Sequence, residues 1–144
     1  MKKQMGVLII SLLFVSCTKN TKDPDWIAIN TEILTSGIWQ FSDYRYDDGF
    51  SSIVTYASLP ACRQDDQRKF NNDGTGEKNE GPTKCNSTDP QTQSVQWRFL
   101  TKYANTIELS GDEYYINQLD AHNFKFHKKH LDPYAPEISY GYSR

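Results

Sequence analysis

The feature that most constrains the fold is a series of short runs in which apolar and polar residues alternate, starting at Ile38. Trp39 and Phe41 alternate with polar residues until the turn sequence Asp47-Asp48-Gly49. Side chains along a strand point to opposite faces in turn, so this period of two predicts half-buried strands. About nine such runs are separated by turn residues, at 38–47, 52–59, 66–70, 75–79, 94–101, 106–110, 113–119, 123–127 and 137–142.

Short strands at this spacing predict an all-β domain, either a barrel or a sandwich. We favour a small antiparallel up-and-down β-barrel of about eight to nine strands, because closure removes the exposed edges that promote aggregation. Leu and Val are scarce, and aromatic side chains are numerous enough to fill the interior instead. The length of 144 residues allows one such domain.

Two segments depart from the strand pattern. Residues 24–35 predict a short amphipathic helix, with Asp23 as N-cap, Pro24 at the first helical position and an apolar stripe through Trp26, Ile29 and Ile33. Residues 80–93 are rich in turn-forming types and predict a long loop.

The N-terminus predicts export. Residues 1–16 combine two lysines with an apolar run too short to span a bilayer permanently, which is typical of a signal peptide. Phe14-Val15-Ser16-Cys17 resembles a lipobox, so we expect cleavage before Cys17 and lipid attachment to it; an ordinary signal peptide beside a chance cysteine is the alternative. The expected organisation is therefore signal peptide 1–16, lipidated tether 17–23 and barrel domain 24–144. Thr18 rather than Asp after the cysteine favours the outer membrane, with the periplasmic or surface face left open.

Export also bears on the remaining cysteines, Cys62 and Cys85. In an oxidising compartment an even pair is most simply a disulfide. A metal site would need further ligands, and no histidine lies between the two cysteines.

The charge of the chain argues against two kinds of partner. Removal of the signal peptide leaves 14 basic and 18 acidic residues, a net charge of −4. This balance gives neither the basic surface of a nucleic-acid-binding protein nor simple electrostatic attraction to anionic lipid. The membrane contact that we expect is the lipid itself.

Several sequence segments, in this order, resemble the lipocalin-like domain lipoproteins of Gram-negative bacteria. They are Leu34-Thr35-Ser36-Gly37-Ile38-Trp39, Pro60-Ala61-Cys62-Arg63-Gln64-Asp65-Asp66, Phe70-Asn71-Asn72-Asp73-Gly74, Glu80-Gly81-Pro82-Thr83-Lys84-Cys85 and Val95-Gln96-Trp97-Arg98-Phe99. The resemblance covers residues 34–127. It implies an up-and-down barrel with bridged cysteines, and it implies no ligand, because fold does not fix function.

No residue pattern predicts catalysis, a cofactor or a metal. Adjacent strand residues face opposite ways, so we expect one of Asp65 and Asp66 to hydrogen-bond turn backbone, and we do not expect a catalytic pair. His127 and His130 are an odd number of residues apart, and the lysines between them oppose a cation, so we expect no metal site there or at His122. Nucleophile and phosphate-binding motifs are missing from the sequence, and we expect a non-enzymatic protein.

The aromatic side chains leave two interpretations open. They could line a pocket for an apolar ligand or form a solid core, since an eight-stranded barrel is just wide enough for either. The residues concerned are Trp39, Phe41, Phe70, Trp97, Phe99, Phe124 and Phe126. Our leading hypothesis is an envelope lipoprotein that binds a small apolar or amphipathic molecule at the mouth of the barrel. The alternative is a protein-interaction module, an accessory subunit or enzyme inhibitor, that presents residues 63–84.

Overall fold

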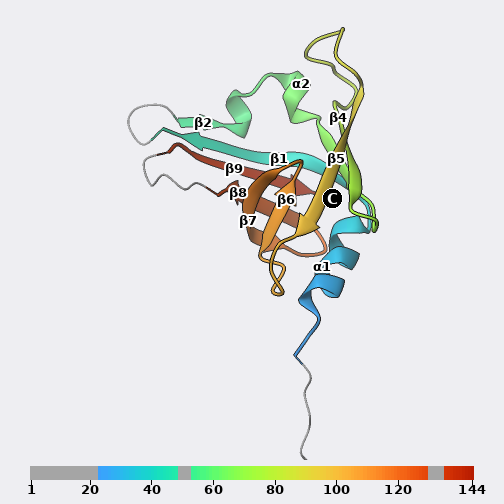
Figure 1. Cartoon of the computed structure of the whole chain (residues 1–144). Helices are drawn as coiled ribbons and strands as arrows, with labels where there is room; N and C mark the ends of the chain where they lie inside the picture. The colour runs from blue at the N-terminus through green and yellow to red at the C-terminus, as the bar shows by residue number, and fades with distance from the viewer. Residues whose placement is uncertain (1–22, 49–52, 130–134) are drawn as a thin grey trace, which may run out of the picture.

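The computed structural model of the protein describes residues 23–48, 53–129 and 135–144. Within these ranges one helix precedes nine strands, and two short helical segments lie between the second and third strands (Figure 1). The helical elements are α1 (Trp26–Thr35), the 3-10 turn η1 (Tyr56–Ser58) and α2 (Ala61–Gln64). The strands are β1 (Ile38–Asp47), β2 (Ile53–Thr55), β3 (Gln67–Phe70), β4 (Thr75–Asn79), β5 (Thr92–Phe99), β6 (Thr106–Leu109), β7 (Asp112–Leu119), β8 (Asn123–Lys128) and β9 (Glu137–Ser143).

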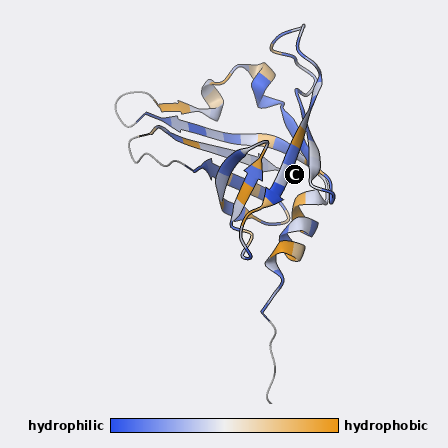
Figure 2. Cartoon of the chain, in the orientation of Figure 1, coloured by the Kyte–Doolittle hydropathy of each residue, from blue (hydrophilic) through white to orange (hydrophobic). Residues whose placement is uncertain are grey.

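The strands form one closed antiparallel barrel. Neighbours pair in chain order from β3 to β9, and β1 closes the sheet by pairing with both β3 and β9. β2 is an extra strand, which pairs with the last residues of β1 on the edge that β3 also uses. The predicted all-β up-and-down barrel is therefore confirmed, with eight strands in the closed sheet and one outside it. Figure 2 shows hydrophobic and hydrophilic residues alternating along several of its strands, the pattern from which the strands were predicted.

Helix α1 lies at one end of the barrel, directly before β1 (Figure 1). Leu34 in its last turn is fully buried, and the Leu34 carbonyl accepts a hydrogen bond of 2.8 Å from the Trp39 indole. On the other side of the indole, the Arg144 guanidinium lies 4.2 Å from the ring centre. We call this the helix end of the barrel, and the opposite end, which β1 reaches at Asp47, the far end.

Aromatic side chains fill the barrel from the helix end to its middle. Trp39, Phe70, Phe124 and Phe126 are each at most 1% exposed. Ring centres lie 5.9 Å apart for Trp39 and Phe124, 5.8 Å for Phe70 and Phe124, and 4.7 Å for Phe124 and Phe126. Burial of each such side chain stabilises the fold by about 1.5–3 kcal/mol, and tilted rings at these distances add to that.

A β-bulge in β1 changes which residues face inward. The register with β9 shifts between Phe41 and Asp43, so Phe41 and then Tyr44 pack on the core, three positions apart rather than two. Gly141 of β9 lies opposite Asp43, where an added Cβ would come within 2.6 Å of the Asp43 Cβ. Glycine is therefore required at this close approach of the two strands.

Two local predictions are wrong. The helix begins at Trp26 with Asp25 as its N-cap, whose carboxylate accepts the Ala28 N–H at 3.1 Å, so Asp23 and Pro24 lie before the helix. The predicted strand at 52–59 is a strand only over Ile53–Thr55 and then becomes η1. Neither η1 nor α2, which follows it, was predicted.

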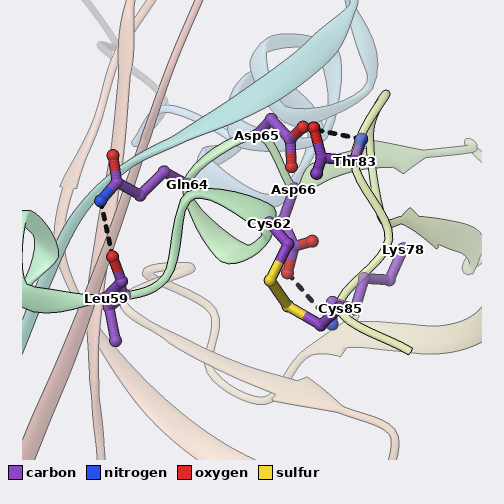
Figure 3. The surroundings of a disulfide bond; sticks show 8 residues. All are labelled: Leu59, Cys62, Gln64, Asp65, Asp66, Lys78, Thr83 and Cys85. Carbon is purple, nitrogen blue, oxygen red and sulfur yellow. Dashed lines mark hydrogen bonds and ion pairs between the residues drawn. A yellow bond between two sulfur atoms is a disulfide. The ribbon is translucent and has the colours of Figure 1, made fainter. Parts of the chain in front are cut away.

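The connection that holds η1 and α2 is fixed by side-chain contacts (Figure 3). Cys62 of α2 is bonded to Cys85, as predicted, with the two Cα atoms 5.1 Å apart. The Gln64 amide donates to the Leu59 carbonyl at 2.7 Å, which holds the chain in an irregular turn. Gly81, at a φ of +68°, approaches the Asp65 backbone so closely that any Cβ would clash. The disulfide thus joins α2 to the loop after β4.

We expect replacement of Cys62 and Cys85 by serine to lower the free energy of unfolding by about 3.5 kcal/mol, because the unfolded chain regains the entropy of the open loop. Urea denaturation of the mature Cys17→Ser protein, with and without this double substitution, measures the difference. Reduced Cys17→Ser protein should unfold at the midpoint of the double variant. Equal midpoints for the oxidised and serine forms would contradict the expectation.

Candidate functional site

Three tyrosines face the interior of the barrel towards its far end. Tyr44 of β1, Tyr114 of β7 and Tyr140 of β9 all pack against the buried core yet are only partly buried themselves. The ring centre of Tyr140 lies 5.6 Å from that of Tyr44 and 6.1 Å from that of Tyr114. We call these residues the inner tyrosine cluster. Since inward-facing side chains here remain partly exposed, solvent reaches the interior at this end.

Arg68 of β3 adds a positive charge inside the barrel. Its Nε donates a hydrogen bond of 2.8 Å to the Tyr142 hydroxyl, and Tyr142 is only 3% exposed. The guanidinium carbon lies 5.5 Å from the centre of the Tyr142 ring. None of the ion pairs between described residues includes Arg68. The arginine is thus held in place by a neutral hydroxyl and an aromatic ring, with its charge uncompensated by a direct carboxylate partner within the described ranges.

A second cation and one carboxylate lie beside Arg68. Lys78 of β4 is directly opposite Arg68 in the register, so the two side chains emerge on the same face of the sheet. The Lys78 ammonium lies 3.1 Å from the carboxylate of Asp66, a residue that is 9% exposed (Figure 3). Arg68, Lys78 and Asp66 together carry a net charge of +1. The interior of the barrel therefore favours an anion over a cation at this point.

The pKa values of the tyrosines report the same surroundings. Burial raises the pKa of Tyr140 to about 12, and the neighbouring tyrosines add to the increase while Lys128 opposes it. Burial also raises the pKa of Tyr114, and the charge of Arg68 opposes this increase. Arg68 is therefore within electrostatic reach of the inner tyrosine cluster. Tyr114 and Tyr140 therefore keep their phenolic protons at physiological pH, and the cluster can offer hydroxyls and ring faces to a bound molecule.

The rim of the far end is charged. Lys128 pairs with Asp112 at 3.0 Å and Lys129 with Glu113 at 2.6 Å. A hollow of about 280 Å³ lies among these four residues and Gly111. A second hollow, of about 200 Å³, is on the outer wall of the barrel around Asp43, Lys125 and Ser139. Both hollows are open and are lined mostly by charged and polar residues, so neither is an enclosed apolar site.

The seven aromatic residues proposed from the sequence do not all lie at the far end. Trp39, Phe70, Trp97 and Phe124 pack on one another or on α1 towards the helix end, where a ligand would have to displace them. Phe99 is partly buried beside Trp97. The remaining two, Phe41 and Phe126, contact the inner tyrosine cluster, with Phe126 5.1 Å from Tyr114 and Phe41 6.4 Å from Tyr44 between ring centres. These two form the floor of the candidate site.

The acidic pair and the histidines have separate partners. Asp65 accepts the backbone N–H of Thr83 at 2.9 Å and Asp66 pairs with Lys78, so the two carboxylates do not converge. His127 contacts Asn117 at 2.8 Å on the outer wall. His122 follows β7 in a turn, where its backbone N–H is bound by Asp120. His130 lies outside the described residues, and within them no three His, Cys, Asp or Glu side chains are grouped for a metal.

The surface proposed for protein interaction is smaller than expected. Residues 63–84 contain β3 and β4, which belong to the barrel wall. Within this region, residues 63–66, 71–74 and 80–84 lie outside the strands, and the last of these begins the connection from Glu80 to Gln91. That connection is the segment a protein partner could contact without disturbing the barrel.

Sequence analysis missed the most distinctive residues of the site. Arg68 is two positions before Phe70 on a predicted strand, which places both side chains on one face, and this signal was present in the sequence. Tyr140 and Tyr142 likewise alternate on the last predicted strand. Tyr44 could not be found in this way, because strict alternation from Phe41 directs it outward and only the bulge turns it inward.

The fold defines a class of protein: a small all-β barrel with an N-terminal helix and one disulfide. The sequence matches no protein-family model and no curated protein. The resemblance to lipocalin-like lipoproteins accordingly stays a prediction. Of the helices in the described part of the chain, none has the length and apolar character needed to cross a membrane.

The raised pKa of Tyr140 predicts a loss of stability in alkali. The folded state holds the phenolic proton of Tyr140 up to about pH 12, whereas the unfolded state releases it near pH 10. The protonated phenol therefore contributes its full stability below pH 10, and this contribution is lost as the pH rises towards 12. In Tyr140→Phe the free energy of unfolding should fall less steeply over this range. Urea titrations at several pH values measure the slope, and equal slopes would contradict the assignment.

Proposed function

We propose that this protein is a lipid-anchored lipoprotein of the cell envelope whose barrel binds a small amphipathic molecule through its far end. The observation on which the proposal depends is the inward-facing Arg68, which is hydrogen-bonded to Tyr142 and acts electrostatically on Tyr114 of the inner tyrosine cluster. We propose further that the ligand carries an anionic group, a carboxylate or phosphate, which Arg68 binds. Its apolar part would lie on the tyrosines and on the Phe41–Phe126 floor.

The physical argument starts from the cost of placing a charge inside a barrel. Arg68 is partly buried, and the Tyr142 hydroxyl accepts a hydrogen bond from its Nε only, so water or an anion can accept from its other N–H groups. A guanidinium has five N–H donors in a planar fork that matches carboxylate and phosphate geometry. An anion at Arg68 would use the donors that Tyr142 does not.

The surroundings of Arg68 favour an amphipathic ligand over a simple ion. The neighbouring rings of Tyr114, Tyr140 and Phe126 are within 5.1–6.1 Å of one another, and they present a mostly apolar surface. The helix end is filled by larger rings, so a ligand could occupy only the far half of the barrel. A short apolar chain or a single ring with one anionic group fits a barrel whose helix end is filled and whose far half is available.

A matched pair of probes tests the charge requirement. Dodecanoate and dodecanol share an apolar chain and differ in the anionic group. We expect the Cys17→Ser mature protein to bind dodecanoate more tightly than dodecanol. Arg68→Met should weaken dodecanoate binding by about 10- to 150-fold, which is equivalent to the loss of a charge-assisted hydrogen bond worth about 1.5–3 kcal/mol. Dodecanol binding should change little. Isothermal titration calorimetry gives both affinities.

Lys69→Met is the matched control, because Lys69 is exposed and is the next residue on the same strand. It removes the same charge from the outside of the barrel and should leave both affinities unchanged. Arg68→Lys should retain part of the dodecanoate affinity. The proposal is wrong if neither probe binds, or if Arg68→Met and Lys69→Met bind dodecanoate equally.

The lipid anchor is tested separately. We expect the chain expressed in a Gram-negative host to begin at Cys17 with acyl chains attached, and to sediment with membranes, because each buried CH₂ contributes about 0.8 kcal/mol to membrane binding. Intact mass and fractionation of wild type and Cys17→Ser measure both properties. A chain that retains residues 1–16, or an unmodified Cys17, would rule the anchor out.

A further inference from the structure

An apolar patch lies at the start of α1, on the part of the helix that does not contact the barrel core. Trp26 and Ile27 are each 42% exposed, and Tyr103, in the connection between β5 and β6, is 59% exposed. Together with Lys102 they line a groove of about 410 Å³ that also includes residues 23–25. We call Trp26, Ile27, Lys102 and Tyr103 the anchor-side patch.

The patch is held in a fixed position relative to the barrel. The Asn30 side chain donates a hydrogen bond of 3.4 Å to the Ala104 carbonyl, which ties α1 to the connection that bears Lys102 and Tyr103. Ile33 and Leu34, one to two turns further along α1, pack against the core. The apolar stripe predicted along the helix is therefore buried only at its C-terminal end. Its N-terminal end has no covering element among the described residues.

The position of the patch in the chain indicates what covers it. Asp23, which lines the groove, is six residues after Cys17. Six residues span at most about 20 Å when fully extended, so a lipid on Cys17 would keep the patch within this distance of the bilayer surface. Trp and Tyr are enriched at the membrane–water interface, where an apolar ring and a polar edge are both accommodated. Lysine suits the same position, with its stem on apolar surface and its ammonium in water.

We infer that the anchor-side patch rests on the bilayer interface when the protein is anchored, an inference that depends on the lipid anchor proposed above. The charges facing the groove are those of Asp23, Asp25 and Lys102, and they sum to −1. Attraction to anionic lipid therefore plays no part, and a zwitterionic bilayer is sufficient. The contact is made by Trp26, Ile27 and Tyr103.

This contact would also orient the barrel. α1 lies at the helix end (Figure 1), whereas the partly exposed tyrosines of the candidate ligand site are towards the far end. With the anchor-side patch on the membrane, the far end is directed away from the bilayer, and a ligand enters from the aqueous side. Without it, the tether alone would leave the barrel free to rotate.

Fluorescence quenching by lipids with brominated acyl chains tests the inference on the full lipidated protein in phosphatidylcholine vesicles. Trp39 and Trp97 are at most 7% exposed inside the barrel, so Trp26 is the tryptophan that bromine atoms can reach. We expect clear quenching in the wild type and its loss in Trp26→Phe. Quenching should persist in about 0.5 M salt, because salt screens charges and does not weaken an apolar contact.

The matched control moves the indole to the barrel wall. Tyr115 is 41% exposed, close to the value for Trp26. Trp26→Phe combined with Tyr115→Trp should therefore show little quenching. Equal quenching from both positions, or none from Trp26, would overturn the inference. If intact mass shows no natural lipid, the Cys17 thiol of the mature chain can be coupled to a maleimide phospholipid, and the same quenching can be measured on the coupled protein. Failure of the natural anchor and failure of the patch then give different results.

Discussion

The pairing of β1 with β9 is the interaction on which the rest of the structure depends. It closes the sheet along seven registered pairs, from Gln40 opposite Ser143 to Asp47 opposite Glu137, and removes the edges that an open sheet would expose. It also joins the first and last strands of the domain, so strands β3 to β8 are held between them. Closure is what brings Tyr44 of β1 opposite Tyr140 of β9 and makes an interior site possible. The near approach at Asp43 and Gly141 belongs to the same seam.

Most of the barrel could be predicted because strand formation here follows a local pattern. Turn residues and alternation located every strand except for boundaries and for 52–59, where η1 and α2 replace most of the expected strand. That segment owes its shape to contacts that a local pattern does not contain. The Gln64 amide bonds the Leu59 carbonyl, the Tyr56 ring packs 5.4 Å from Phe41, and Cys62 is tied to Cys85. The disulfide partner could be predicted by cysteine counting, whereas the turn that it stabilises could not.

The candidate site divides in the same way. The inward direction of Arg68 follows from alternation with Phe70. The sequence does not distinguish an arginine inside a barrel from one at a solvated edge, and only the structure places Tyr142 next to Arg68. Tyr44 depends on a bulge, which is a property of two paired strands rather than of one. Of the seven aromatics chosen from the sequence, six are buried and Phe99 is partly buried. What alternation could not supply is their depth along the barrel axis, and depth separates the packed helix end from the partly solvated far end.

The two ends of the barrel therefore differ in physical character, and this difference links the core to both proposals. At the helix end, rings and Leu34 exclude solvent and provide the stability that a partly solvated interior elsewhere would lack. That stable end also fixes α1, whose exposed first turn forms the anchor-side patch. Towards the far end the interior gives up part of its apolar burial to tyrosines that remain partly exposed, while Arg68, which is opposite Trp39 in the register, contacts Tyr142 inside the barrel. A barrel built only for stability would gain by replacing them with aliphatic residues, and the ligand that we propose would account for their presence.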